Sequence, residues 1–151
     1  MTNLKLTIGF IILSTTTAIA EAPLCSNPAN ECNKLVACNE SSGEYFQGGA
    51  SNGDEGVIFM RSSSGTECTG DWWRTLFGMG QAQITCDDGR QGQALFSWFE
   101  RDTGTVVGNG KFDDGALIRF WTGTNLNGYF AIHGDKERLR MKCSSADLLL
   151  G

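Results

Sequence analysis

The sequence is poor in histidine, proline and basic residues. It has one His, two Pro, and 12 Lys and Arg against 17 Asp and Glu, which gives a formal net charge of −5. A single histidine leaves little for a zinc site or for acid–base catalysis. The shortage of positive charge argues against a nucleic-acid-binding protein, because such proteins need a clustered basic surface. We therefore expect no nucleic-acid partner.

Long apolar runs are also missing. The apolar segment 6–13 follows Lys5 and is well short of the roughly 18 to 20 residues that span a bilayer. The small residues Ala18 and Ala20 come next and are typical of a signal-peptidase site. We predict a signal peptide over 1–20, with cleavage after Ala22 as an alternative, and a secreted or periplasmic protein without a membrane span after cleavage. Removing 20 of the 151 residues leaves 131, and the loss of Lys5 takes the net charge to −6.

Cysteine is well represented in the predicted mature chain. An even number of cysteines in an exported chain predicts disulfide bonds. The sequence leaves their pairing open, although Cys143 on a predicted strand is a candidate partner for Cys86. Zinc is disfavoured because the cysteines lack a closely spaced C-x2-C pair, and we expect no cofactor. The disulfide candidates are Cys25, Cys32, Cys38, Cys68, Cys86 and Cys143.

Short strands between glycine turns dominate the chain from residue 44 onward. Apolar and polar residues alternate in 78–86, and Gly89, Gly104 and Gly115 mark turns, so the pattern is that of a β-meander. We expect a loop at 48–53 and a turn at 62–65. The predicted strands are 44–47, 56–61, 78–86, 91–100, 105–112 and 116–121.

The two ends of the mature chain follow other patterns. Apolar residues at spacings of three and four predict a short helix within 23–43. Leu139, Met141 and Cys143 alternate with basic residues, which predicts a half-buried strand. The fold class is therefore mainly β: a small, disulfide-bonded antiparallel β-barrel or sandwich, built as a meander, with a short N-terminal helix. We assign 21–143 to a single domain and 144–151 to a C-terminal tail.

Local motifs give little support for catalysis. Residues 49–53 match G-x-S-x-G, but a nucleophile elbow needs a larger α/β domain with His and acid partners. His133 is expected in a hairpin turn. The acidic turns at 87–89 and 113–115 hold paired carboxylates for a glycosidase or a Ca²⁺ site, whereas ordinary hairpin chemistry explains them equally well. The protein is more consistent with a non-enzyme.

Aromatic residues are the best binding candidates. Trp72 and Trp73 are adjacent, so on a strand they point to opposite sides and one of them is exposed. An exposed Trp73 beside Arg74 would be a strong anchor for a partner. Core filling is the competing explanation for each tryptophan. The candidate binding residues are Trp72, Trp73, Arg74, Trp98 and Trp121.

The second half of the chain resembles a group of known proteins. It carries Gly-x-Gly at 78–80, Cys-x-Asp-Gly at 86–89 and a second Gly-x-Gly at 108–110. With the signal peptide and the cysteines, these elements resemble small exported, Gly-rich β proteins of uncharacterised function from Gram-negative bacteria. The resemblance implies a periplasmic or secreted location and transfers no catalytic residue.

Three functions follow from these patterns. We expect an exported, non-enzymatic binding protein of the cell envelope or extracellular space, whose partner is a protein or glycan of the envelope. A small cell-wall-glycan hydrolase that uses Asp or Glu is one alternative. A carbohydrate- or lipid-binding barrel that uses its interior or a Trp-lined face is the other, and an interior packed solid with side chains would exclude its lumenal form.

Overall fold

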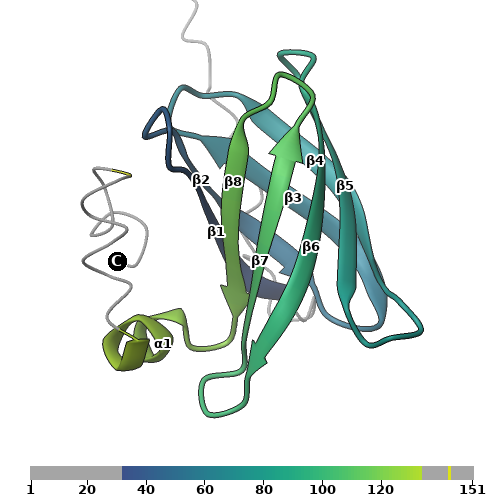
Figure 1. The fold of residues 1–151 in the computed structure, drawn as a ribbon, viewed down its shortest axis with the longest axis vertical. Helices are drawn as coiled ribbons and strands as arrows, with labels where there is room; N and C mark the ends of the chain where they lie inside the picture. The colour runs from purple at the N-terminus through teal and green to yellow at the C-terminus, as the bar shows by residue number, and fades with distance from the viewer. Residues whose placement is uncertain (1–31, 134–142, 144–151) are drawn as a thin grey trace, which may run out of the picture.

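The structure is a closed antiparallel β-barrel of eight strands followed by one short helix (Figure 1). A computed structural model describes residues 32–133 and Cys143. Each strand pairs with the next, and β8 pairs back with β1. The prediction of a mainly β, antiparallel meander is confirmed, and of the two predicted forms the structure is a barrel, not a sandwich. Its elements are β1 (Cys32–Asn39), β2 (Tyr45–Ser51), β3 (Glu55–Ser62), β4 (Glu67–Arg74), β5 (Gly80–Cys86), β6 (Gln91–Glu100), β7 (Thr105–Phe112), β8 (Leu117–Gly123) and α1 (Leu126–His133).

The interior of the barrel is apolar because alternate residues of each strand face inward. Glycines make room for the largest of these side chains: a Cβ at Gly110 would lie 2.6 Å from Cε2 of Phe120. Burying the inward-facing side chains supplies the main driving force for closing the barrel. The inner cluster includes Leu35, Ala37, Phe46, Ala50, Ile58, Met60, Cys68, Ala82, Ile84, Cys86, Ala94, Phe96, Phe112, Ile118 and Phe120.

A second apolar cluster lies outside the barrel, where α1 packs beside β8 and β1 (Figure 1). Asn125 caps the N-terminus of the helix: its side-chain oxygen accepts a hydrogen bond from the Gly128 N–H at 2.9 Å. Trp121 lies 5.6 Å from Phe130, centroid to centroid. The disulfide between Cys38 and Cys143 belongs to this outer cluster. Within the described ranges, no helix is both long and apolar enough to cross a membrane.

The disulfide bonds differ from the suggested pairing. Cys86 is bonded to Cys68, which lies directly opposite on the neighbouring strand, and Cys143 is bonded to Cys38. The suggested Cys86–Cys143 bond is therefore wrong. Cys32 is also disulfide-bonded. Disulfide bonds persist in non-reducing compartments, so these bonds indicate such a compartment for this protein.

Three local predictions are also wrong. Residues 32–39 of the predicted helix form β1, and residues 48–51 of the predicted loop belong to β2. His133 ends α1 instead of lying in a hairpin turn, and its ring lies 4.5 Å from that of Tyr129. The predicted signal peptide at 1–20, the tail at 144–151 and most of the strand that ends at Cys143 lie outside the described residues.

Candidate functional site

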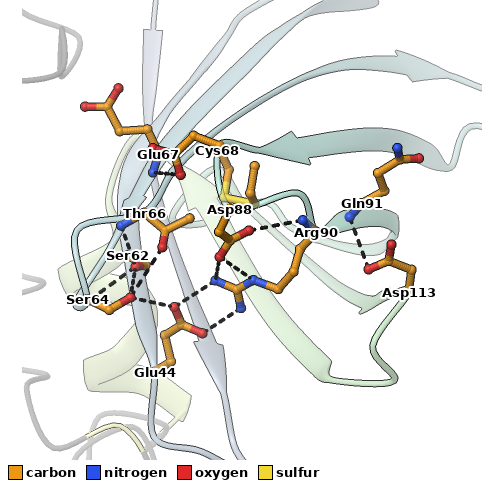
Figure 2. Close-up of a disulfide and its surroundings, with 12 residues drawn as sticks. Glu44, Ser62, Ser64, Thr66, Glu67, Cys68, Asp88, Arg90, Gln91 and Asp113 are labelled. Atoms are coloured by element: carbon orange, nitrogen blue, oxygen red, sulfur yellow. Dashed lines mark hydrogen bonds and ion pairs between the residues drawn. A yellow bond between two sulfur atoms is a disulfide. The ribbon is translucent and has the colours of Figure 1, made fainter.

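Arg90 lies between β5 and β6, whose connecting turn is at the end of the barrel away from α1 in Figure 1. Its guanidinium lies 2.8 Å from Glu44 Oε2 and 2.8 Å from Asp88 Oδ2, as Figure 2 shows. The same group covers the rings of Phe46 and Phe112, at 5.8 and 5.0 Å from their centroids. Both rings are buried inside the barrel. Arg90 therefore covers the apolar side chains at this end of the barrel interior, which we call the closed end.

Arg90 favours the charged state of the two carboxylates that it contacts, Glu44 and Asp88. The hydrogen bond from Arg90 lowers the pKa of the Glu44 carboxyl, with burial opposing this shift, and hydrogen bonds to Glu44 and Asp88 raise the pKa of Arg90. Ser64 also donates to Glu44, at 3.2 Å. Arg90, Glu44 and Asp88 are thus joined by charge-assisted hydrogen bonds, which stabilise the closed end.

The paired acidic residues of the turns lie at this closed end and serve the backbone. Asp87 accepts a hydrogen bond from the Glu67 N–H at 3.1 Å, and Asp113 accepts one from the Gln91 N–H at 3.2 Å. Asp114 accepts one within its own turn. Among the described residues, no group of three or more His, Cys, Asp or Glu side chains could hold a metal ion. Ordinary turn chemistry therefore accounts for these carboxylates.

The opposite end of the barrel holds a cavity of about 420 Å³, a volume typical of small-molecule sites. Its lining includes inner-cluster side chains such as Ile58 and Phe96 as well as residues of the end turns such as Gly53 and Gly78. The cavity therefore extends from the barrel interior to its mouth. The turns 52–54, 75–79 and 101–104 surround that mouth. None of the described residues that line the cavity is an Asp or Glu.

Trp72 forms a fixed part of the cavity wall. Its indole N–H donates to the Ser51 carbonyl at 3.0 Å. A Cβ at Gly56 would lie 3.0 Å from Trp72 Nε1, so glycine leaves the space that the indole occupies. The Ser51 hydroxyl in turn accepts from the Val57 N–H at 2.8 Å. The ring is held before any ligand enters, which keeps the entropic cost of binding low.

The predicted binding residues fall into three groups. Trp72, Arg74 and Trp98 line the cavity, and Trp98 is 59% exposed. Trp73 belongs to a separate groove on the outer face of β4 to β7. Trp121 is 2% exposed and packs beneath α1. Trp121 is therefore corrected to a core residue, while binding by the other four stays a prediction.

Sequence reasoning missed most of the cavity wall. Ile58, Phe96 and Val106 line it together with Thr122, but on the sequence they follow the same alternation as any core residue. A signal was present in the small residues at inward positions, such as Ala50 and Gly80. Small side chains at one level of a barrel leave space that larger ones would fill.

Exposed apolar side chains gather around the mouth of the cavity. Leu76 and Phe77 lie at the tip of the turn between β4 and β5 and are almost fully exposed. Such a group of exposed apolar residues on a small protein marks a place where a ligand or partner enters. The apolar residues of this group lie in or near the turns 75–79 and 101–104 and are Leu76, Phe77, Met79, Trp98 and Phe99.

Together, the fold and the cavity define a small up-and-down β-barrel with one closed end and one open end. No family model and no characterised protein matches the chain. Its fold is similar to that of a redesigned β-barrel, mFAP0, bound to DFHBI, with 14% identity, a TM-score of 0.51, and coverage of 63% of this chain and 97% of that one. A de novo designed fluorescence-activating β-barrel is similar with 15% identity, a TM-score of 0.50, and coverage of 64% of this chain and 93% of that one. At these identities the similarity concerns the fold alone.

Proposed function

We propose that this protein is an exported, non-enzymatic binding protein that holds a small, mainly apolar molecule in the open end of its barrel. The observation that carries the proposal is the cavity of about 420 Å³ beside Ile58, Trp72, Phe96 and Val106. Burial of an apolar ligand against these side chains is favourable at about 25 cal/mol per Å² of apolar surface. The barrel interior is filled by side chains at the closed end, but it has free space at the open end. A ligand could therefore bind inside the barrel, as the binding-barrel alternative requires.

Three further features support this proposal. One of the similar structures is a redesigned barrel bound to a small molecule, DFHBI. The exposed apolar residues around the mouth would provide a first contact for an apolar ligand. The disulfide bonds are compatible with an exported protein, which agrees with the predicted signal peptide and with a secreted or periplasmic location.

Filling the cavity is expected to abolish binding. Val106→Trp places a large ring among the lining residues, and we expect it to weaken binding of the neutral fluorophore N-phenyl-1-naphthylamine at least tenfold, because the lost contact area is worth more than about 1.4 kcal/mol. The measurement is a fluorescence titration of protein expressed from the full-length chain with its disulfide bonds intact.

The matched control for this experiment is Val57→Trp. Val57 lies on β3 near the same end but points outward and is exposed, so this substitution adds the same ring outside the cavity. Circular dichroism establishes that both variants are folded. Equal affinity of the two variants, or failure of the wild-type protein to bind the fluorophore at a single saturable site, would contradict the proposal.

A second candidate function is recognition of an envelope glycan, which a groove on the outer face favours. Trp73, Gln81, Leu95 and Asn109 lie directly opposite one another in turn across β4, β5, β6 and β7. They line a groove of about 340 Å³. An aromatic ring with neighbouring amides suits a sugar, because the ring stacks on its apolar face and amides donate to and accept from hydroxyl groups.

For this second candidate, Trp73→Ala is expected to reduce retention on isolated peptidoglycan by about tenfold or more, since buried aromatic anchors dominate such contacts. Co-sedimentation of the purified protein with peptidoglycan measures the effect. Val106→Trp is the control, because it alters the cavity and leaves the outer groove intact. If the wild-type protein stays in the supernatant, the glycan hypothesis is wrong while the cavity proposal is unaffected.

A further inference from the structure

We propose that the turn between β4 and β5 inserts Leu76 and Phe77 into the surface of a lipid bilayer, so that the open end of the barrel docks on a membrane. The membrane contact is argued from the turn itself. Only its use, the passage of an apolar ligand between bilayer and cavity, rests on the proposed function. The inference goes beyond that function because it names a partner surface and the residues that contact it.

Four hairpin turns of the barrel share one hydrogen-bonding pattern. In each, the N–H of the first residue donates to the carbonyl of the fifth, at 2.7 to 2.9 Å. The N–H of a glycine at the fourth position donates to the carbonyl of the first residue, at 2.9 to 3.1 Å. That glycine has a left-handed φ, between 78° and 94°. The four turns are 62–66, 75–79, 86–90 and 112–116.

The second and third residues of these turns differ between the two ends of the barrel. At the closed end they are polar, as Ser63 and Ser64, Asp87 and Asp88, and Asp113 and Asp114. At the open end they are Leu76, which is fully exposed, and Phe77, which is 89% exposed. The polar pairs show that this turn needs no apolar residue. Leu76 and Phe77 also bury almost no surface within the fold, so their apolar side chains are available to a partner.

The shape and size of this surface favour a bilayer over a protein partner. Leu76 and Phe77 stand at the tip of a tight turn and form a convex point, not a groove. A stable protein interface involves roughly 20–30 residues on each side, whereas five exposed apolar residues gather at the mouth. A bilayer requires no matching shape, and its binding strength follows the apolar area that enters it. A few protruding apolar side chains are therefore sufficient.

Trp98 is suited to the boundary between lipid and water. An indole is stable there because its ring is apolar while its N–H is polar. Trp98 is largely exposed and lines the mouth of the cavity together with Gly78, which belongs to the β4–β5 turn. Insertion of the tip therefore brings Trp98 to the bilayer surface and turns the mouth toward the lipid. An apolar ligand then passes between bilayer and cavity without crossing water.

The charges at this end point to a contact that does not depend on anionic lipids. Arg74 lies 3.4 Å from Asp54 Oδ1, so its charge is partly compensated. The mouth turns and the strand residues next to them hold no excess of positive charge. Their charged residues are Arg74 and Arg101 on one side, and Asp54, Glu55, Glu100 and Asp102 on the other. Anionic lipids attract basic clusters, so binding should be no stronger to anionic than to zwitterionic vesicles.

The test is flotation of the purified protein with phosphatidylcholine vesicles. Leu76→Ser/Phe77→Ser gives this turn the Ser-Ser-Gly sequence that the barrel already uses at 63–65, so the fold should be retained, as circular dichroism can check. We expect this double variant to bind vesicles at least about tenfold more weakly than wild type, because two apolar side chains no longer enter the lipid. Phe77→Trp keeps a large ring at the tip and should retain binding.

Leu117→Ser is the matched control, because Leu117 is also an exposed leucine but begins β8 at the closed end. It should bind vesicles as wild type does. Equal losses from Leu117→Ser and from Leu76→Ser/Phe77→Ser would overturn the inference. So would stronger binding of wild type to vesicles that contain phosphatidylglycerol, lost at high salt, since the contact would then be electrostatic.

Two further outcomes separate this inference from its alternatives. Wild-type protein that binds no vesicles but forms dimers, which Leu76→Ser/Phe77→Ser converts to monomers, would assign the tip to contact between two copies and overturn the inference. Titration of N-phenyl-1-naphthylamine without vesicles tests the cavity separately. Wild-type protein that binds this fluorophore but not the vesicles overturns the membrane contact alone. Protein that binds the vesicles but not the fluorophore supports the membrane contact and contradicts the proposed function.

Discussion

Replacing Arg90 by Met is expected to lower the free energy of unfolding by about 3 kcal/mol, because removal of one member of a buried ion pair leaves the other charge uncompensated. The Arg90 and Glu44 side chains are each 17% exposed and are joined by two hydrogen bonds, at 2.8 and 3.0 Å. Met retains much of the contact with the two rings below it. The loss is therefore mainly electrostatic, and urea unfolding at pH 7 measures it.

Two controls separate this electrostatic effect from packing. Arg90→Met combined with Glu44→Gln removes both charges, so the double variant should be more stable than Arg90→Met alone. The pKa of Glu44 is lowered in the folded protein, so its contribution is present above the unfolded pKa and is lost as the pH falls through the folded value. The difference between wild type and Arg90→Met should therefore shrink in acid. A constant difference across this pH range would show that Arg90 acts through packing.

The strands of the second half could be predicted because two local signals coincide there. Polar and apolar residues alternate where one face of the strand is exposed, as in β5 and β6. Gly89 and Gly115 have φ of 92°, a left-handed conformation that glycine adopts without strain. Each turn thus marks where one strand ends and the next begins.

β1 could not be predicted because both of its faces are buried. Leu35 points into the barrel, whereas Val36 points outward into the cluster that α1 and Cys143 cover. Consecutive apolar residues then imitate the spacing of a helix. The cover over Val36 comes from residues about 90 or more positions later, and no local pattern indicates it.

Glycine misled the prediction of β2 for another reason. Gly48 is paired within the sheet, and a Cβ there would collide with the backbone of Phe59 on β3. Glycine at such a position permits the close approach of two strands that a curved barrel requires. On the sequence the same residue indicates a loop.

The cavity was beyond sequence reasoning because it depends on the sum of side-chain volumes around the barrel. Phe46 and Phe112 meet at the closed end, 6.1 Å apart, and fill it. At the other end Ala50 and Gly80 leave space beside Trp72 and Phe96. The residue types are ordinary at both ends of the barrel. Only the register of all eight strands decides which side chains lie at the same height along the barrel axis.

Loss of the Cys38–Cys143 disulfide is expected to have the largest effect on stability, a decrease of about 4 to 5 kcal/mol in the free energy of unfolding. The bond links residues 105 positions apart, whereas Cys68–Cys86 links residues 18 positions apart. Because a cross-link restricts the unfolded chain more when the loop is longer, Cys68–Cys86 should contribute about 3 kcal/mol.

The comparison is made between Cys38→Ala/Cys143→Ala and Cys68→Ala/Cys86→Ala, by urea unfolding of the oxidised proteins. All four cysteines are buried, so both double variants remove similar apolar volume and differ mainly in loop length. Cys68–Cys86 lies inside the barrel between paired strands, while Cys38–Cys143 lies outside it, in the outer cluster and next to the backbone of Asn39 and Glu44. A larger loss from Cys68→Ala/Cys86→Ala would show that packing inside the barrel outweighs chain entropy. The expected order instead means that the outer bond, which does not line the cavity, contributes more to stability than the bond inside the barrel.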